Sequence, residues 1–208
     1  MCVIDLPTDA LPSYRGTMID GEGFGHFGGY ADFREWLAEN CETSDGLWLV
    51  LAKKGSGITT VTYAEALDAA LEHGWIDGQA KRIDDATYRQ RFTPRRPQSP
   101  WSQRNCTAAE AMIAAGRMAP RGLAEVERAK GDGRWDRAYA GPASAEPHPD
   151  FLDALALNPA AAEFYATLDS RNRYAIYYRL QSAKRPETRA RRIADFVDRL
   201  EERRYFYE

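Results

Sequence analysis

Apolar residues recur at helical spacing in one part of the chain and run together in another, which predicts both helices and strands. Phe33, Trp36 and Leu37 stand three and four residues apart and predict an amphipathic helix near residues 30–40. The run 46–52 is short, almost wholly apolar and rich in β-forming residues. Such a run predicts a buried strand.

A second helix and a hairpin are predicted next. The sequence Thr-Tyr-Ala-Glu at 62–65 is a capping box, and Gly74 ends the helix that it opens. Residues 75–83 and 87–92 predict two strands, because both are rich in β-forming residues and flank an Asp-Asp turn at 84–85.

Loop-forming residues separate this hairpin from two further predicted helices. A loop rich in proline and arginine spans 93–105. A second capping box at 107–110 predicts the start of a helix that runs toward Ala115. Another helix is predicted between Pro120 and Gly131.

The C-terminal part of the sequence predicts helices only. A linker is predicted over 140–149, which holds three prolines and has no periodicity. After Pro186 an apolar stripe at helical spacing comprises Ala190, Ile193, Ala194, Val197 and Leu200. We therefore predict an α+β fold with a small, mostly antiparallel sheet, followed by a C-terminal helical hairpin or bundle. The predicted parts are an irregular Gly-rich arm (1–29), an α+β domain (30–139), the linker (140–149) and a helical domain (150–208).

Charge is segregated along the 208 residues, although the formal net charge is only −3. Residues 1–79 carry a net charge of −9 and residues 80–104 carry +5. Residues 105–169 carry −4 and residues 170–208 carry +5. Two basic islands in an acidic protein indicate either a focused anion site or internal pairing with the acidic segments. A negative net charge disfavours a duplex-DNA binder.

Several protein classes are excluded by the sequence. Cys2, Cys41 and Cys106 lie far apart, which excludes a disulfide framework and a cysteine-rich zinc module. The three histidines have no neighbouring partner, so no metal or redox cofactor is expected. Residues 23–28 match GxGxxG, but the lack of a preceding buried strand favours an ordered arm over a dinucleotide site. No apolar run reaches the roughly 20 residues of a membrane span, and without a signal peptide we expect a cytoplasmic protein.

The predicted hairpin carries the candidate site. Alternation along its first strand gives one face the residues Trp75, Asp77, Gln79 and Lys81. Its second strand shows Tyr88, Gln90 and Phe92 on one face, and Arg89 and Arg91 on the other. One face of the hairpin is then wholly polar or aromatic. Arginine binds carboxylate or phosphate in a bidentate manner, and an aromatic side chain offers a flat wall for a ring.

These residues and the following loop predict a ligand site. The predicted ligand-binding residues are Trp75, Gln79, Lys81, Phe92, Arg95, Arg96, Ser99, Trp101, Ser102 and Asn105. If the protein is an enzyme, Asp77 is the predicted general base, Tyr88 the proton donor and Arg91 the oxyanion stabiliser. The alternative is a rigid structural loop whose arginines pair with the acidic first segment.

Four motifs point to a known family. Residues 75–79, 90–97, 99–102 and 183–193 together resemble the YdeI/OmpD-associated, or bacteriocin-protection, family. The resemblance runs from about Phe33 to Leu200, and the last 60 or so residues are similar to that family's C-terminal helical domain. It implies a role in envelope stress resistance and a periplasmic location. It implies no reaction and no catalytic residues.

Three functions follow from these observations. The first is a cytoplasmic protein that binds a small anionic or aromatic molecule between the segment 75–105 and the basic C-terminal helices. It could also be a cofactor-independent acid/base enzyme. The second is a stress-protection or protein-interaction module without a ligand. The third is a nucleic-acid binder, a partner that we do not expect, and neither membrane insertion nor an oligomeric state is predicted.

Overall fold

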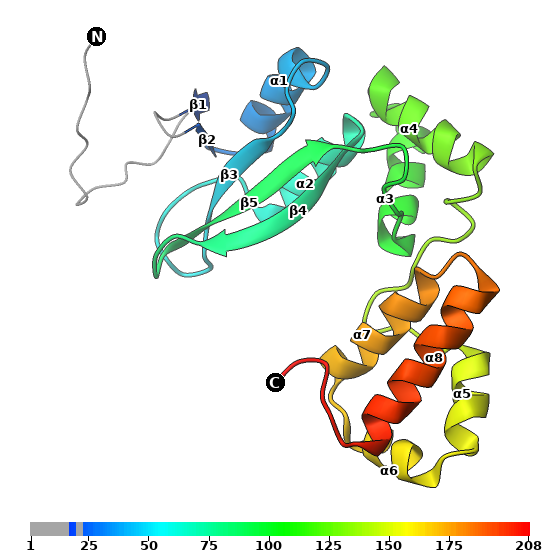
Figure 1. Ribbon diagram of the computed structural model, residues 1–208. Coiled ribbons are helices and arrows are strands. Elements are labelled where there is room, and N and C mark those ends of the chain that lie inside the picture. The colour runs from blue at the N-terminus through cyan, green and yellow to red at the C-terminus, as the bar shows by residue number, and fades with distance from the viewer. Residues whose placement is uncertain (1–16, 20–22) are drawn as a thin grey trace. The chain divides into compact units, whose positions relative to one another are not determined.

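The computed structural model describes residues 17–19 and 23–208, which form two compact units (Figure 1). The first unit comprises the described residues up to Ser99 together with Asn105–Asp136. The second comprises Pro100–Arg104 and Arg137–Glu208. No helix in the described part of the chain is long and apolar enough to cross a membrane.

A five-stranded sheet organises the first unit. Its strands are β1 (Thr17–Ile19), β2 (Phe24–Phe27), β3 (Leu47–Ala52), β4 (Trp75–Arg82) and β5 (Thr87–Pro94), in the order β1-β2-β3-β5-β4. Only β2 and β3 pair in parallel, and the other three pairings are antiparallel. The prediction of an α+β fold with a small, mostly antiparallel sheet is confirmed.

The sequence predicts that the Gly-rich arm is irregular, but two stretches of it form the strands β1 and β2. β2 extends the sheet beyond β3, with Phe24 opposite Trp48. The glycine at 25 allows this pairing, because a Cβ there would lie 2.6 Å from the side chains of Leu47 and Phe27. Residues 1–16 and 20–22 of the predicted arm lie outside the described residues.

The core of the first unit lies on one face of the sheet. Helices α1 (Tyr30–Asn40) and α2 (Tyr63–Glu72) pack on that face (Figure 1). The inward side chains come from alternate positions of β3 and from both helices: Leu47, Leu49, Leu51, Phe33, Leu37, Ala66, Ala69 and Ala70. The capping box predicted at 62–65 is confirmed, since the Thr62 side chain accepts from the Glu65 backbone and the Glu65 carboxylate accepts from the Thr62 N–H.

Two more helices complete this unit. α3 runs from Gln103 to Ala114 and α4 from Pro120 to Gly131. The capping box predicted at 107–110 is wrong, because α3 begins four residues earlier and those residues lie inside it. α4 approaches the end of α2 closely, since a Cβ on Gly122 would lie 2.2 Å from the Glu72 carbonyl oxygen.

The second unit is helical, as predicted. Its helices are α5 (Pro149–Ala156), α6 (Pro159–Thr167), α7 (Ser170–Gln181) and α8 (Pro186–Glu201) (Figure 1). The first three begin at side-chain caps supplied by His148, Asn158 and Asp169. Their shared core contains Phe151, Leu155, Phe164, Ile176, Leu180, Ile193, Phe196 and Leu200.

Candidate functional site

Strand β4 contains a β-bulge that changes the predicted pattern of faces. The pairing with β5 shifts between Asp77 and Ala80. Gly78 and Gln79 therefore stand together opposite the single residue Arg91. The extra residue reverses the alternation of every side chain beyond the bulge.

The bulge places Lys81 on the opposite face from Trp75 and Asp77. Lys81 pairs with Arg89, whereas Asp77 pairs with Phe92 on the face covered by helices. The prediction that Trp75, Asp77, Gln79 and Lys81 share one face is wrong for Lys81. The cause is local, because a strict two-residue alternation assumes an unbroken ladder.

Two of the predicted aromatic ligand contacts are core residues. Trp75 and Phe92 have no solvent exposure and belong to the core cluster of the first unit. The Trp75 Nε1 donates to the Cys41 carbonyl at 3.3 Å. Both aromatic rings therefore hold the sheet to its helices.

The three predicted catalytic residues do not share a face. Asp77 accepts a hydrogen bond from the Tyr63 hydroxyl at 2.8 Å. Tyr88 packs against the core, and burial raises its pKa. Arg91 alternates with Phe92 along β5 and lies on the other side of the sheet. Their acid–base chemistry stays a prediction.

The predicted loop residues of the first unit make hydrogen bonds within the protein. Arg95 is buried, and its N–H donates to the Gly74 carbonyl at 3.0 Å. The Arg96 N–H donates to the Ser99 hydroxyl at 2.9 Å, and the Ser99 N–H donates back to the Arg96 carbonyl at 2.9 Å. The Arg134 guanidinium donates to the Ser99 carbonyl at 2.9 Å.

The other predicted ligand contacts do not belong to that hydrogen-bonded turn. Trp101 is buried in the second unit, where Ser102 forms a bridge with Tyr139. Asn105 is buried in α3, and Gln79 is exposed in the bulge. The ligand-binding roles of these residues stay predictions.

Cations gather around one tryptophan on the face of the sheet opposite α1 and α2. The Trp48 ring centroid lies 5.3 Å from the Lys81 Nζ, 5.1 Å from the Arg89 guanidinium carbon and 5.9 Å from that of Arg91. The Arg89 guanidinium also lies 4.8 Å from the centroid of the Phe24 ring. We call Trp48, Lys81, Arg89 and Arg91 the basic–aromatic face.

Most of the described arginines in the first unit pair with carboxylates, whereas the cations of this face do not. Six arginines of that unit pair with carboxylates: Arg34, Arg82, Arg117, Arg121, Arg128 and Arg134. Lys81, Arg89 and Arg91 form no ion pair with any residue that the structure describes. Each contacts the Trp48 ring instead, an interaction of roughly 0.5–1 kcal/mol at an exposed site. The face therefore holds three positive charges without a carboxylate partner in the described part of the chain.

Trp48 and Arg89 are not among the site residues that the sequence predicts. Trp48 lies in a run predicted to be a buried strand. The alternation of side chains along that strand could have shown that Trp48 faces away from the core. Leu47 and Leu49 point into the core, so the residue between them points out. The prediction that Arg89 and Arg91 share one face of the hairpin is correct. The sequence did not predict which strand lies beside them on that face.

The described residues gather no cluster of potential metal ligands, and the two described cysteines are buried. No group of three or more His, Cys, Asp or Glu side chains is gathered in residues 17–19 and 23–208. Burial raises the pKa of the Cys41 thiol and raises that of Cys106 to about 11. Both are buried thiols, unlike the thiolates of reactive cysteines.

The fold defines a chain with an α+β unit, whose sheet has a basic–aromatic face, and a separate helical unit. Residues 144–203 match the family described as "Bacteriocin-protection, YdeI or OmpD-Associated", so the chain carries a domain of that family. Residues 26–125 match a different model, "Domain of unknown function (DUF8412)". The predicted family is thus confirmed for the helical part, while the motifs at 75–102 belong to the other model. No curated protein and no solved structure is significantly similar to the chain.

Proposed function

We propose that the first unit binds a small anionic ligand that carries a flat ring, on the basic–aromatic face. One observation carries this proposal: three cations surround Trp48 and have no carboxylate partner among the described residues. Like charges held close together repel one another, and a bound anion removes that cost.

The charges favour a phosphate ester over a single carboxylate. Two guanidinium groups and one ammonium group match a doubly charged phosphate, and arginine binds phosphate in a bidentate manner. The half-buried Trp48 ring offers a flat surface beside the charges. A nucleoside monophosphate has both features, so AMP is a suitable first probe.

Titration calorimetry at low salt tests the proposal. We expect AMP to bind the full chain, and Arg91→Gln to weaken binding at least about tenfold, as expected for loss of a charged hydrogen bond. Arg96→Gln is the matched control, since Arg96 is exposed and lies outside the basic–aromatic face. Equal AMP affinity in both variants contradicts the proposal, as does the absence of binding.

A nucleic-acid function makes a different prediction. Aromatic and basic residues on an open sheet face also bind single strands, with affinity that rises with strand length. An oligonucleotide of about eight residues that binds far more tightly than AMP, with steep salt dependence, would contradict a small-molecule function.

The family match favours a second candidate function for the helical unit. Its description names bacteriocin protection and association with OmpD, which fits a protection or interaction module. If the helical unit has this function, we expect a strain that lacks the protein to be more sensitive to a bacteriocin. We expect the Arg89→Gln/Arg91→Gln variant to restore resistance in that strain. Failure of that variant to restore resistance would link protection to the basic–aromatic face. We also propose that the protein is cytoplasmic.

A further inference from the structure

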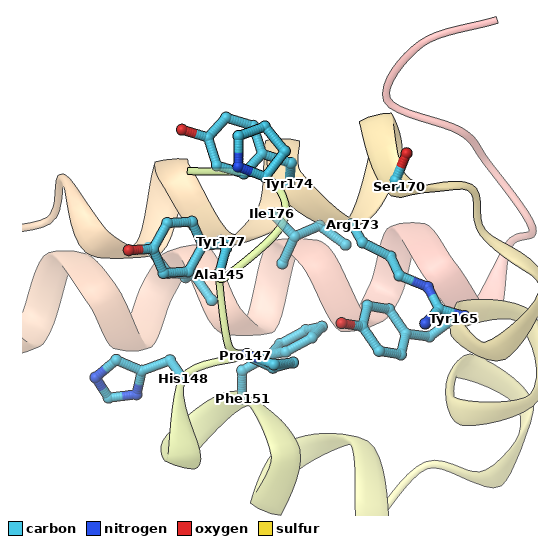
Figure 2. A pocket seen from close by; sticks show the side chains of 12 residues that line it. Ala145, Pro147, His148, Phe151, Tyr165, Ser170, Arg173, Tyr174, Ile176 and Tyr177 are labelled. Atoms are coloured by element: carbon cyan, nitrogen blue, oxygen red, sulfur yellow. The ribbon is translucent and has the colours of Figure 1, made fainter. Parts of the chain in front are cut away.

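A cavity of about 240 Å³ lies within the helical unit (Figure 2). The segment 142–148 forms one wall, and side chains of α5, α6 and α7 form the others. Its apolar lining includes Phe151, Ile176 and Leu180, all buried. None of the residues that line it is an aspartate or a glutamate.

Two of the three tyrosines that line the cavity have their hydroxyls bound to the backbone. The Tyr177 hydroxyl accepts from the Ala140 N–H at 2.8 Å. The Tyr174 hydroxyl donates to the Ala140 carbonyl at 3.3 Å. These bonds fix the two rings as a wall.

The third tyrosine, Tyr165, has a different environment. Its hydroxyl makes no hydrogen bond to any residue that the structure describes, and Figure 2 shows it turned toward the cavity. Burial raises its pKa, so the group is a neutral phenol at physiological pH. A half-buried tyrosine hydroxyl usually has a partner, and here the space for that partner is the cavity.

The polar groups that line the cavity favour a hydrogen-bond acceptor. Arg173 is fixed by donating to the carbonyls of Leu168 at 3.0 Å and Ala166 at 2.7 Å, and its guanidinium lies 5.4 Å from the Tyr165 ring centroid. His148 accepts from the Asp150 N–H through Nδ1 at 3.2 Å. This contact occupies Nδ1, which leaves Nε2 as the ring nitrogen for a ligand.

We infer that this cavity binds a single-ring aromatic carboxylate. The ring would pack against Phe151 and Ile176, and the carboxylate would accept from the Tyr165 hydroxyl beside the positive charge of Arg173. Apolar cavities of roughly 150 Å³ hold benzene, so the volume suits one ring with a small substituent. Drug-sized ligands fill pockets of roughly 300–1,000 Å³, so this smaller cavity favours a ligand smaller than a nucleotide.

Benzoate titrated into the full chain tests the inference by calorimetry or ligand-detected NMR. We expect binding that Tyr165→Phe weakens about threefold to tenfold, the effect of one hydrogen bond. Tyr178→Phe is the matched control, because Tyr178 lies on α7 but does not line the cavity. Ala145→Trp fills the cavity from its wall and should abolish binding, while circular dichroism confirms that the variant is folded.

Four results would overturn the inference. The first is the absence of benzoate binding at about 1 mM, a concentration at which even a ligand of very modest affinity is detected. The second is equal binding of benzoate to the natural protein and to the Ala145→Trp variant. Cyclohexanecarboxylate bound as tightly as benzoate would exclude selection for a flat ring. Benzamide bound as tightly would exclude selection for a carboxylate. An Arg89→Gln/Arg91→Gln protein should bind benzoate normally, so this test is independent of the proposed function.

Discussion

At the scale of single residues, Glu72 ties three segments of the first unit together. Its side chain is fully buried, yet it accepts from the Tyr30 hydroxyl at 2.7 Å and from the Arg34 Nε at 3.0 Å, and it pairs with Arg117. These partners come from α1 and from the segment before α4. A buried carboxylate is tolerated here because its acceptor sites are occupied.

Replacing Glu72 by alanine should destabilise the fold. Loss of one partner from a buried ion pair costs about 3–5 kcal/mol. Arg34 and Arg117 are about half-exposed and can turn to water, so we expect a smaller loss, of about 2 kcal/mol, below that range. Urea unfolding measures the loss, and Glu35→Ala on the exposed side of α1 is the control. Equal stability of the two variants would refute this role for Glu72.

At the scale of elements, the bulge in β4 decides which side chains reach the basic–aromatic face. The buried Gln90 side chain donates through Nε2 to the Gly78 carbonyl at 2.8 Å. This bond satisfies a bulge carbonyl that has left the ladder. The register of Lys81 thus depends on a residue of the neighbouring strand.

Gln90→Met keeps the size of that side chain and removes the bond. We expect the variant to lose about 1 kcal/mol of stability and to exchange amide hydrogens faster around Gly78. Hydrogen exchange read by NMR locates the change, and Gln79→Met provides an exposed control in the same bulge. Unchanged exchange near Gly78 would show that the bulge does not need Gln90.

The hairpin also shows how far sequence patterns predict this molecule. Its two strands were placed within two residues, because alternation and a turn are local signals. The bulge was missed because polar residues on both sides hide a shift in the alternation. β2 was missed because its glycines resemble a loop, whereas the parallel pairing with β3 is a long-range contact. The cluster around Trp48 joins β3, β4 and β5, so it needs the strand order as well as the strands.

At the scale of the whole molecule, the segregated basic residues divide into those that pair with carboxylates and those that do not. Some basic residues pair internally, such as Arg82 with Asp85 and Arg189 with Asp150. Lys81, Arg89 and Arg91 belong to the same basic segment as Arg82 and have no such partner among the described residues. Exposed ion pairs add little stability. The unpaired cluster is therefore the more informative part of the charge pattern.

Alkaline pH should destabilise both units, because burial raises the pKa of several thiols and phenols: Cys41, Cys106, Tyr30, Tyr88, Tyr165 and Tyr174. The pKa of Cys106 rises from an ordinary 9.0 to about 11, and that of Tyr174 from 10.0 to about 12. The folded chain therefore holds these protons more tightly than the unfolded chain does. Their contribution to stability is complete below pH 9 and is lost progressively as the pH rises from 9 toward 12.

The Cys106→Ala variant shows how much of the alkaline loss of stability comes from the Cys106 thiol. Between pH 9 and 11 the variant should lose stability less steeply than the natural protein, since it lacks the thiol whose pKa is raised. Urea unfolding at a series of pH values measures both slopes. Met112→Ala removes a buried, non-titrating side chain from the same helix and should lower stability by a similar amount at every pH. If the Cys106→Ala curve instead runs parallel to that of the natural protein above pH 9, burial of this thiol does not oppose its ionisation.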